Sequence, residues 1–293
     1  MHADETRIGA SLVRRLLAEQ FPRWARLPLR RVRSAGTVNA LYRLGDELTV
    51  RLPRIANGAD DAVREHAWLP RLAPRLPFPV PEIVGLGTPT AGYPWHWSVL
   101  RWLDGDPPTA GALPDGRQLA ADLGAFVASL RALDLPGGPP AHRGTPLSAV
   151  DAETRSAIAD LRGSVDTGAA TAAWEEALAA PRWTGPPRWL HSDLMPMNLL
   201  VREGRLAAVL DFATLGTGDP ACDLVPAWNL LPATARPVFR DAAGADDADW
   251  ARGRGWALSM ALVQLPYYRD TNPVIAANAT HVIREVLAGR RDL

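Results

Sequence analysis

The 293-residue sequence has a single cysteine, no excess of either charge and no long hydrophobic run. One thiol, Cys222, cannot form an intrachain disulfide, so an oxidising compartment would give this fold no benefit. The 32 basic and 32 acidic residues cancel, which leaves no overall field to attract nucleic acid or an anionic membrane. No apolar stretch reaches the roughly 18 residues that span a bilayer, and the first residues lack a signal-peptide pattern. We therefore expect a cytoplasmic protein without nucleic-acid or membrane partners, and no protein partner is implied.

Missing motifs exclude further classes of protein. There is no cysteine or histidine cluster for zinc, no Gly-x-Ser-x-Gly nucleophile elbow and no Gly-x-x-x-x-Gly-Lys phosphate loop. The composition, 47% hydrophobic and 22% charged, is that of an ordinary globular protein. Its length suffices for one large domain or two modest lobes.

The first hundred residues carry most of the strand signals. Apolar residues at helical spacing predict an opening amphipathic helix, and a turn between two apolar runs predicts a hairpin. A second helix and a further strand follow. These expected elements are the helix near 8–17, the strands 40–44 and 48–52, the helix near 60–72 and the strand 97–103.

After the turn-rich segment Asp104–Pro108 the pattern becomes mostly helical. We therefore expect an N-lobe of residues 1–103 and a C-lobe of residues 104–293. The expected C-lobe elements are helices at 119–133, 150–163 and 170–180, short strands at 199–202 and 206–210, and helices from about 221 to the end.

Three polar residues of the C-lobe have the spacing of a phosphoryl-transfer site. Asp193 and Asn198 lie on one short loop, and Asp211 ends a strand one hairpin further on. The hairpin should return Asp211 to the side of Asn198. A carboxylate and an amide oxygen suit Mg²⁺, and the second carboxylate can accept or orient a hydroxyl proton.

A structural role is the alternative for each residue taken alone. Asp and Asn in a proline-containing loop are usually turn formers or helix caps, and a His-x-Asp triplet is common. The combination at this spacing, flanked by strands, favours the functional interpretation.

Longer motifs around these residues resemble one family. They are His191-x-Asp193-x-x-x-x-Asn198, Leu210-Asp211-Phe212 and the segment 218–224, Gly-Asp-Pro-Ala-Cys-Asp-Leu. Over roughly residues 30 to 285 the chain is similar to the aminoglycoside phosphotransferase family. This resemblance implies an α+β, bilobal protein-kinase-like fold, with a small β-rich N-lobe and a larger helical C-lobe. It also implies Mg²⁺ and ATP or GTP as co-substrate.

The resemblance also assigns roles in the C-lobe. Asp193 would be the catalytic base or hydroxyl-orienting residue, and Asn198 and Asp211 would hold Mg²⁺. His191 and Asp219 would support the catalytic loop.

In the N-lobe, Arg51 stands where kinases usually place a lysine that contacts the α- and β-phosphates, and Glu65 is its expected ion-pair partner. Arginine can make such a contact bidentately. A surface charge on a strand and another on a helix would be the alternative. The remaining nucleotide contacts are expected from a small-residue loop, Ser34, Gly36 and Thr37, which could equally be a plain turn, and from the backbone of an interlobe hinge, Leu100, Arg101 and Leu103.

The second departure from the family pattern, besides Arg51, is Ser192, which replaces the usual glycine of the catalytic loop. Serine fits without strain if its backbone angles are ordinary. If the position needs a positive φ, serine costs about 1 kcal/mol or more.

The acceptor is left open by the sequence. The family phosphorylates antibiotics, namely aminoglycosides, macrolides and certain peptides, and metabolites such as choline, homoserine or methylthioribose. An acidic pocket for a polycation could come from the aspartates of 241–249, although such a run also starts a solvated helix. The aromatic residues could line an apolar pocket or belong to the core. The balanced charge and the C-lobe tryptophans favour a mixed or macrolide-like acceptor, with candidate contacts Asp223, Trp228, Tyr267 and Tyr268.

Three functions remain possible at this point. They are an antibiotic-inactivating O-phosphotransferase, a housekeeping kinase of a small metabolite, and a non-catalytic nucleotide-binding protein. The intact Asp193, Asn198 and Asp211 argue against the third.

Overall fold

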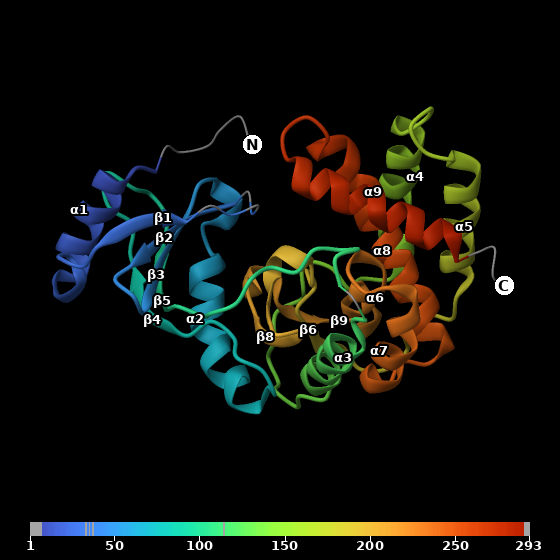
Figure 1. Ribbon diagram of the computed structural model, residues 1–293, viewed down its shortest axis with the longest axis horizontal. Helices are drawn as coiled ribbons and strands as arrows, with labels where there is room; N and C mark the ends of the chain where they lie inside the picture. The colour runs from blue at the N-terminus through green and yellow to red at the C-terminus, as the bar shows by residue number, and fades with distance from the viewer. Residues whose placement is uncertain (1–7, 33, 35, 37, 114, 290–293) are drawn as a thin grey trace.

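The computed structural model describes residues 8–32, 34, 36, 38–113 and 115–289, and it has the two predicted lobes (Figure 1). The N-lobe contains an antiparallel five-stranded sheet of order β1-β2-β3-β5-β4. Its strands are β1 (Leu29–Val32), β2 (Asn39–Leu44), β3 (Leu48–Pro53), β4 (Ile83–Gly87) and β5 (Trp97–Arg101).

Alternating apolar residues give the sheet one face that packs on the N-lobe core. In β2 the buried positions are Ala40, Tyr42 and Leu44, which alternate with partly exposed ones as a half-buried strand requires. Helix α1 (Ala10–Gln20) packs against the sheet, and the Tyr42 hydroxyl donates to the Ile8 carbonyl at 2.8 Å. Helix α2 (Asp61–Leu72) lies between the sheet and the C-lobe (Figure 1).

The two hydrophobic cores do not divide at residue 103. One core joins α1 to the sheet. Leu69, Leu72 and Val80, although they precede the last strand of the sheet, belong to the larger core of the C-lobe. Helix α2 is thus anchored to the C-lobe at its C-terminal end, while Glu65 in its N-terminal half pairs with Arg51 of β3.

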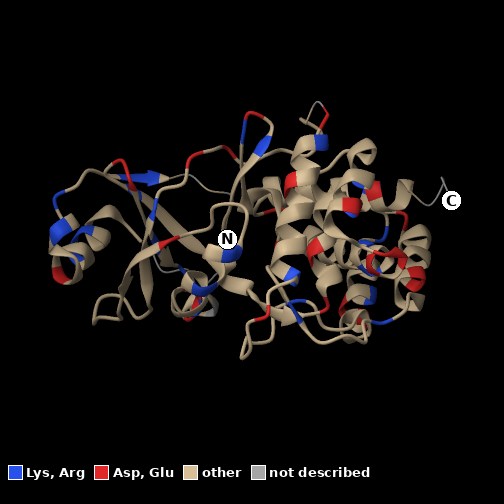
Figure 2. Cartoon of the chain, turned by 90° about the horizontal axis from the view of Figure 1, so that it is seen from below, with Lys and Arg blue, Asp and Glu red and all other residues tan. Residues whose placement is uncertain are grey.

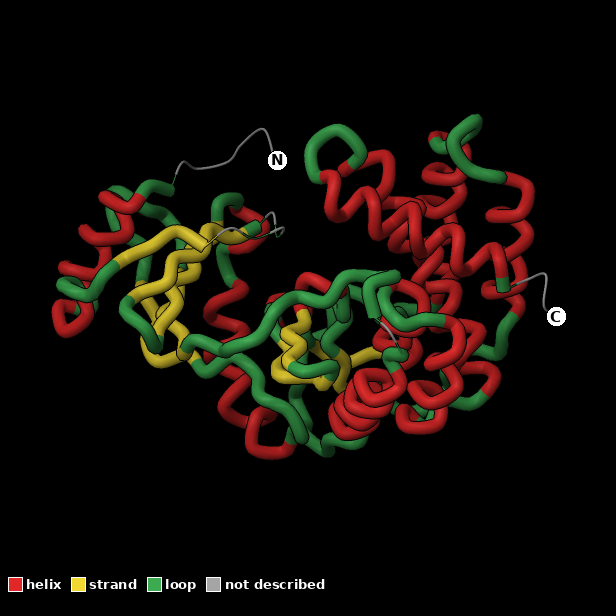
Figure 3. Tube along the Cα trace, in the orientation of Figure 1, coloured by secondary structure: helices red, strands yellow, loops and turns green. Residues whose placement is uncertain are grey.

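The C-lobe is mainly helical, with two short β-ribbons on the side that faces the N-lobe (Figure 3). One ribbon pairs β6 (Arg188–Leu190) with β9 (Gly216–Gly218), and the other pairs β7 (Leu199–Arg202) with β8 (Arg205–Val209). The helices are α3 (Arg117–Arg131), α4 (Asp151–Asp160), α5 (Thr167–Ala179), α6 (Pro226–Asn229), α7 (Arg236–Ala243), α8 (Asp247–Tyr268) and α9 (Pro273–Ala288).

The linker between the lobes is fixed to the second ribbon. The Asp106 N–H donates to the Val201 carbonyl at 3.1 Å, and the Val201 N–H donates back to Asp106 at 2.9 Å. This pair of hydrogen bonds sets the hinge against the strand that follows the catalytic loop.

Basic and acidic residues are interspersed along the chain in both lobes (Figure 2). Within the part of the chain that the structure describes, no helix is long and apolar enough to cross a membrane.

Candidate active site

The loop between β6 and β7 carries Asp193, and side chains hold both of its carboxylate oxygens. Arg143 Nη1 donates to Oδ1 at 3.1 Å, and Asn198 Nδ2 donates to Oδ2 at 3.0 Å. The same amide nitrogen also donates to the Asp193 carbonyl at 2.9 Å. The Asp193 side chain is 25% exposed, so a solute can reach it. The carboxylate is therefore oriented and accessible.

The β7–β8 hairpin returns Asp211 to this loop. The Leu210 N–H donates to the Asn198 carbonyl at 2.7 Å, which brings the end of β8 beside the catalytic loop. His191 accepts from the Asp193 N–H through Nδ1, so its Nε2 carries the proton and donates to the Leu210 carbonyl at 2.8 Å. Asp211 itself has φ 58°, a left-handed conformation that is costly for a non-glycine residue. The hairpin and His191 together hold it there.

The environment of Asp211 fits a divalent cation. Its Oδ1 is buried without a hydrogen-bond partner among the described residues, 3.8 Å from Arg51 Nη1. Burial raises the pKa of Asp211, opposed by Arg51 and reinforced by Glu65 and Asp193. The side-chain amide nitrogen of Asn198 donates to Asp193, which leaves the side-chain oxygen Oδ1 of Asn198 as a ligand. An unpaired carboxylate oxygen and an amide oxygen form the kind of hard, partial ligand set that Mg²⁺ completes with water and phosphates.

A second carboxylate, Asp61 at the start of α2, belongs to the same crowded region. Burial raises its pKa to about 7, and the negative charge of Asp211 is the next cause. A cation bound at Asp211 would relieve the repulsion between these two carboxylates.

Arg51 and Glu65 form the ion pair that the sequence predicts. Arg51 Nη1 donates to Glu65 Oε1 at 3.0 Å, and Nη2 contacts Oε2, so the pair is bidentate. Both residues are buried. Arginine is the only strong cation available anywhere in this chain, because the sequence contains no lysine. The pair points Arg51 at Asp211 across the interlobe space.

In the predicted hinge, several backbone N–H groups are already hydrogen-bonded within the N-lobe. The Arg101 N–H donates to the Glu82 carbonyl at 2.9 Å, so only the Arg101 carbonyl remains for a purine. Leu100 is paired on both sides within the sheet. The Trp102 N–H donates to the Glu47 carbonyl, in the turn before β3, at 2.7 Å. In the described part of the chain, the Leu103 N–H is the first after β5 that makes no backbone hydrogen bond.

Of the predicted nucleotide-covering loop, Ser34 and Gly36 are described and Thr37 lies outside the described residues. The Gly36 N–H donates to Ser34 Oγ at 3.0 Å. The contact of Ser34 and Gly36 with a phosphate stays a prediction.

Asp223, predicted as a possible acceptor contact, is instead buried beneath the catalytic loop. Its Oδ2 accepts from the His191 N–H at 2.6 Å and its Oδ1 from the Ser192 N–H at 2.8 Å. It is 2% exposed, and burial raises its pKa to about 6. An acceptor cannot reach this carboxylate, which fixes the backbone of the loop.

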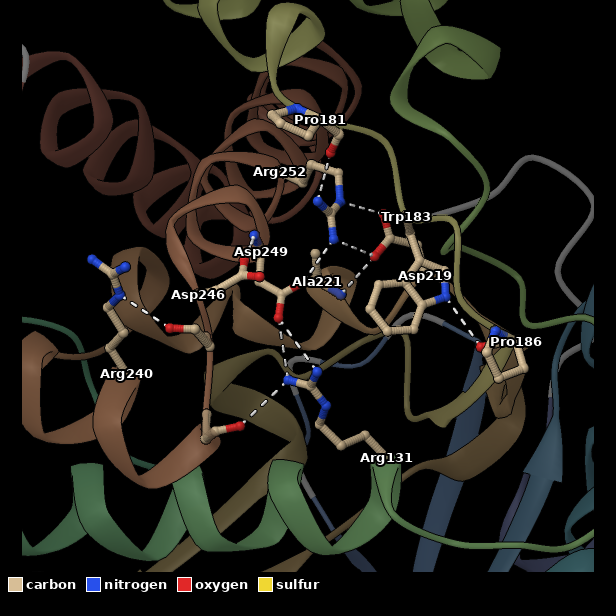
Figure 4. Close-up of polar contacts among 12 residues, drawn as sticks. Arg131, Pro181, Trp183, Pro186, Asp219, Ala221, Arg240, Asp246, Asp249 and Arg252 are labelled. Carbon is tan, nitrogen blue, oxygen red and sulfur yellow. Dashed lines mark hydrogen bonds and ion pairs between the residues drawn. The ribbon is translucent and has the colours of Figure 1, made fainter.

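Asp219, predicted to support the catalytic loop, makes its side-chain contacts elsewhere (Figure 4). Its carboxylate caps the following turn through the Ala221 N–H at 3.0 Å and accepts from Arg252 Nε at 2.7 Å. Arg252 also binds Asp249 at 2.7 Å. This buried network joins α8 to the segment after β9, so the loop brace is Asp223.

The predicted aromatic contacts separate into two groups. Trp228 is 3% exposed and packs on Trp250 with ring centroids 4.7 Å apart, so it belongs to the core. Tyr267 is 56% exposed, and Tyr268 meets it edge-on at the end of α8. Of these three predicted aromatic residues, only the two tyrosines lie where a solute can contact them.

The sequence prediction missed Arg143, which contacts Asp193. Residues 139–144 run beside β9, where the Ala141 N–H donates to Thr217 at 3.1 Å. A Cβ at Gly216 would lie 2.4 Å from Ala141 N, and one at Gly218 would lie 2.6 Å from the Gly144 carbonyl. These two glycines allow residues 139–144 to approach β9 closely, and this approach brings Arg143 to Asp193. They are the sequence signal that could have revealed a third strand-like segment here.

Ser192, which replaces the usual glycine of the catalytic loop, has a positive φ of 66°, so its backbone is strained. Its Oγ donates to the Thr214 carbonyl at 2.8 Å, which offsets the strain. We expect Ser192→Ala to lower the free energy of unfolding by about 1 kcal/mol, since it loses the hydrogen bond and keeps the strain. Ser192→Gly loses the same bond but relieves the backbone, so it should be about 1 kcal/mol more stable than Ser192→Ala. Urea unfolding of the three proteins measures both differences. Equal losses in the two variants would show that the backbone is not strained here.

The two lobes, the Arg51–Glu65 pair under the sheet and the carboxylates opposite it define a phosphotransferase of the kinase-like class. The model of the phosphotransferase enzyme family matches residues 30–256, and the chain belongs to this family. The chain is therefore a phosphotransferase with a hydroxyl acceptor. No curated protein matches the sequence.

Solved structures with the same fold include antibiotic phosphotransferases. The GDP complex of wild-type aminoglycoside 2'-phosphotransferase-IIIa is 19% identical, with 97% of this chain and 100% of that chain covered and a TM-score of 0.76. The gentamicin–APH(2'')-IIa complex is 15% identical, covering 96% and 99%, with a TM-score of 0.64. Macrolide 2'-phosphotransferase MphH from Brachybacterium faecium is 23% identical, covering 93% and 97%, with a TM-score of 0.60. At these identities the likeness shows the fold.

Proposed function

We propose that this protein transfers the γ-phosphate of ATP or GTP to a hydroxyl group of a small molecule, with Mg²⁺. The observation that carries the proposal is the convergence of Asp193, Asn198 and Asp211 at the junction of the two ribbons. Arg51, held by Glu65, supplies the opposite wall. Phosphoryl transfer depends mainly on positioning and charge neutralisation, and these residues supply both.

Each residue has a role that its contacts support. Asp193, with both oxygens held, orients the acceptor hydroxyl and takes its proton. Asn198 and Asp211 hold the metal, which when bound neutralises charge on the phosphates. Arg51 contacts the α- and β-phosphates, and the backbone of Arg101 and Leu103 contacts the purine. His191 and Asp223 position the loop without touching a substrate.

The acceptor in this proposal is an antibiotic, and phosphorylation would confer resistance in the cytoplasm. Support comes from the relatives of known structure, which include complexes with kanamycin, gentamicin and streptomycin, and macrolide 2'-phosphotransferases. A metabolite kinase with the same site, for instance of choline, homoserine or methylthioribose, is the second candidate.

A nucleotide-consumption screen separates these candidates. The purified protein is incubated with Mg²⁺ and either ATP or GTP, and then with a panel of hydroxyl-bearing antibiotics and the three metabolites. We expect acceptor-dependent release of nucleoside diphosphate with one antibiotic class. A far higher kcat/KM for a metabolite would replace the antibiotic assignment with the second candidate. No stimulation by any compound would count against both.

A further inference from the structure

Arg143 contacts the catalytic loop through only one of its three guanidinium nitrogens. Its Nη1 donates to Asp193 Oδ1 at 3.1 Å and to the Ser192 carbonyl at 3.2 Å. Its Nε and Nη2 make no hydrogen bond with any residue that the structure describes, and neither atom is fully buried. The Arg143 side chain is 25% exposed. N–H groups of the guanidinium are therefore open to a ligand beside Asp193.

The backbone on both sides of Arg143 is fixed to the segment around β9. The His142 N–H donates to the Thr214 carbonyl at 3.1 Å, and the Asp219 N–H donates to the Gly144 carbonyl at 2.7 Å. Gly144 has φ 104°, a conformation that residues with a Cβ rarely adopt. The fold itself therefore places Arg143 at the catalytic loop.

Holding Asp193 in place does not by itself require a charged group. Its other carboxylate oxygen is held by the neutral amide of Asn198 at 3.0 Å. Burial, and next the charge of Arg143, lower the pKa of His142, so this imidazole is neutral at neutral pH. Among the residues that the structure describes, Arg143 is the only basic side chain within ion-pair distance of Asp193. It is the cation available on this side of the site.

The proposed reaction brings a second anion close to Asp193. The acceptor oxygen would lie about 3 Å from the carboxylate and about 3–3.5 Å from the γ-phosphorus, which places the phosphorus within about 7 Å of Asp193. The transferring group carries negative charge on its equatorial oxygens, and two anions at this separation repel each other. A guanidinium that holds Asp193 with Nη1 can reach an equatorial oxygen with Nη2 or Nε and so offset this repulsion.

We infer that Arg143 is a catalytic residue, which donates hydrogen bonds from its free N–H groups to an equatorial oxygen of the γ-phosphoryl group during transfer. This inference rests on the proposed function and adds to it a residue from outside the motifs that identify the family. In the step, the acceptor oxygen forms a bond to the γ-phosphorus while the bond between that phosphorus and the β,γ-bridging oxygen breaks. The nucleoside diphosphate leaves, the hydroxyl proton passes to Asp193, and Arg143 keeps all of its protons.

The kinetic test removes the guanidinium and then supplies it again. Arg143→Ala should lower kcat by about 10²–10³-fold, the usual loss when one donor to a transition-state oxygen is removed, and leave the KM for the nucleotide unchanged. Guanidinium ion, added far below denaturing concentrations, should restore part of this kcat. Arg143→Lys keeps the charge with a single nitrogen, so its kcat should lie between the other two. Arg162→Ala, at an exposed position after α4, is the control and should neither lose turnover nor respond to guanidinium.

A transition-state analogue separates contact with the phosphoryl group from an effect through Asp193. Nucleoside diphosphate, Mg²⁺, fluoride and the best acceptor form a complex in which the three fluorines of trifluoromagnesate replace the equatorial oxygens. In ¹⁹F NMR we expect one fluorine resonance to move in Arg143→Ala, and the affinity for the analogue to fall about 10²-fold with the affinity for nucleoside diphosphate unchanged. Arg143→Lys should move the same resonance, which keeps the comparison available should Arg143→Ala fail to fold.

The possible failures of the inference and of the proposed function are distinguishable. Equal kcat in the wild-type protein and in Arg143→Ala would overturn the inference. A lower kcat with an unchanged fluorine spectrum and unchanged analogue affinity would also overturn it, because Arg143 would then act only by positioning Asp193. In both cases transfer by the wild-type protein leaves the proposed function standing. A wild-type protein that transfers phosphate to no acceptor would refute the proposed function and the inference with it.

Discussion

Replacing Asp193 with asparagine should lower kcat for phosphoryl transfer by about 10²–10⁴-fold, the usual contribution of a positioned general base. Asparagine keeps the shape of the side chain, but its amide group can neither accept a proton nor pair with Arg143 as the carboxylate does at 3.1 Å. The effect should fall on kcat, because the role proposed for Asp193 is toward the acceptor hydroxyl and not toward the nucleotide. Steady-state kinetics with the best acceptor measures it.

The matched control is Asp160→Asn at the exposed end of α4, which should leave kcat unchanged. Nucleotide affinity, measured by calorimetry, should be the same in the wild-type protein and in Asp193→Asn. Unchanged turnover in Asp193→Asn would refute the mechanism, whereas lost nucleotide binding would show that the loop itself had been disturbed.

Asp211→Asn should have an effect of similar size through the metal. We expect kcat to fall on the order of 10³-fold, since charge neutralisation by a bound cation is worth several kcal/mol. The Mg²⁺ concentration that gives half-maximal activity should rise at the same time. Titrating Mg²⁺ at fixed nucleotide measures both quantities, with Asp241→Asn on α7 as the exposed control.

The same substitution should stabilise the metal-free protein. Burial raises the pKa of Asp211 in the folded state, so the ionised carboxylate is less stable there than in the unfolded chain. Stability is therefore lost as pH rises from the unfolded pKa through the raised folded one, and at neutral pH a neutral asparagine removes that cost. Thermal unfolding without metal should show a higher midpoint for Asp211→Asn. A lower midpoint would mean that the contact with Arg51, 3.8 Å away, dominates.

The central part of the site was predictable because its geometry is local. Asp193 and Asn198 share one loop, and a single hairpin connects them to Asp211. The pairing of Arg51 with Glu65 required only a strand followed by a helix. By contrast, Arg143 reaches Asp193 from a loop about fifty residues earlier, and only the packing of residues 139–144 on β9 brings it there.

Other errors have equally physical causes. Asp219 and Asp223 lie in one motif, and no local pattern tells which of them turns toward the loop and which toward α8. The strand β1 was not expected because Arg30 and Arg31 interrupt its apolar pattern. The strands β6 and β9 have three residues each, too few to carry a periodic signal. Trp228 was a candidate pocket residue, although aromatic residues at helical spacing more often belong to the core, and it packs on Trp250 in the core.

The most direct test of the phosphoryl-transfer assignment is ³¹P NMR of a reaction that contains the wild-type protein, Mg²⁺, ATP and the acceptor with the highest turnover in the screen. We expect a new phosphate monoester resonance on the acceptor that grows in step with ADP, and that stays at background when Asp193→Asn replaces the wild-type protein. ADP formed with inorganic phosphate alone, or an equal monoester signal from Asp193→Asn, would contradict it.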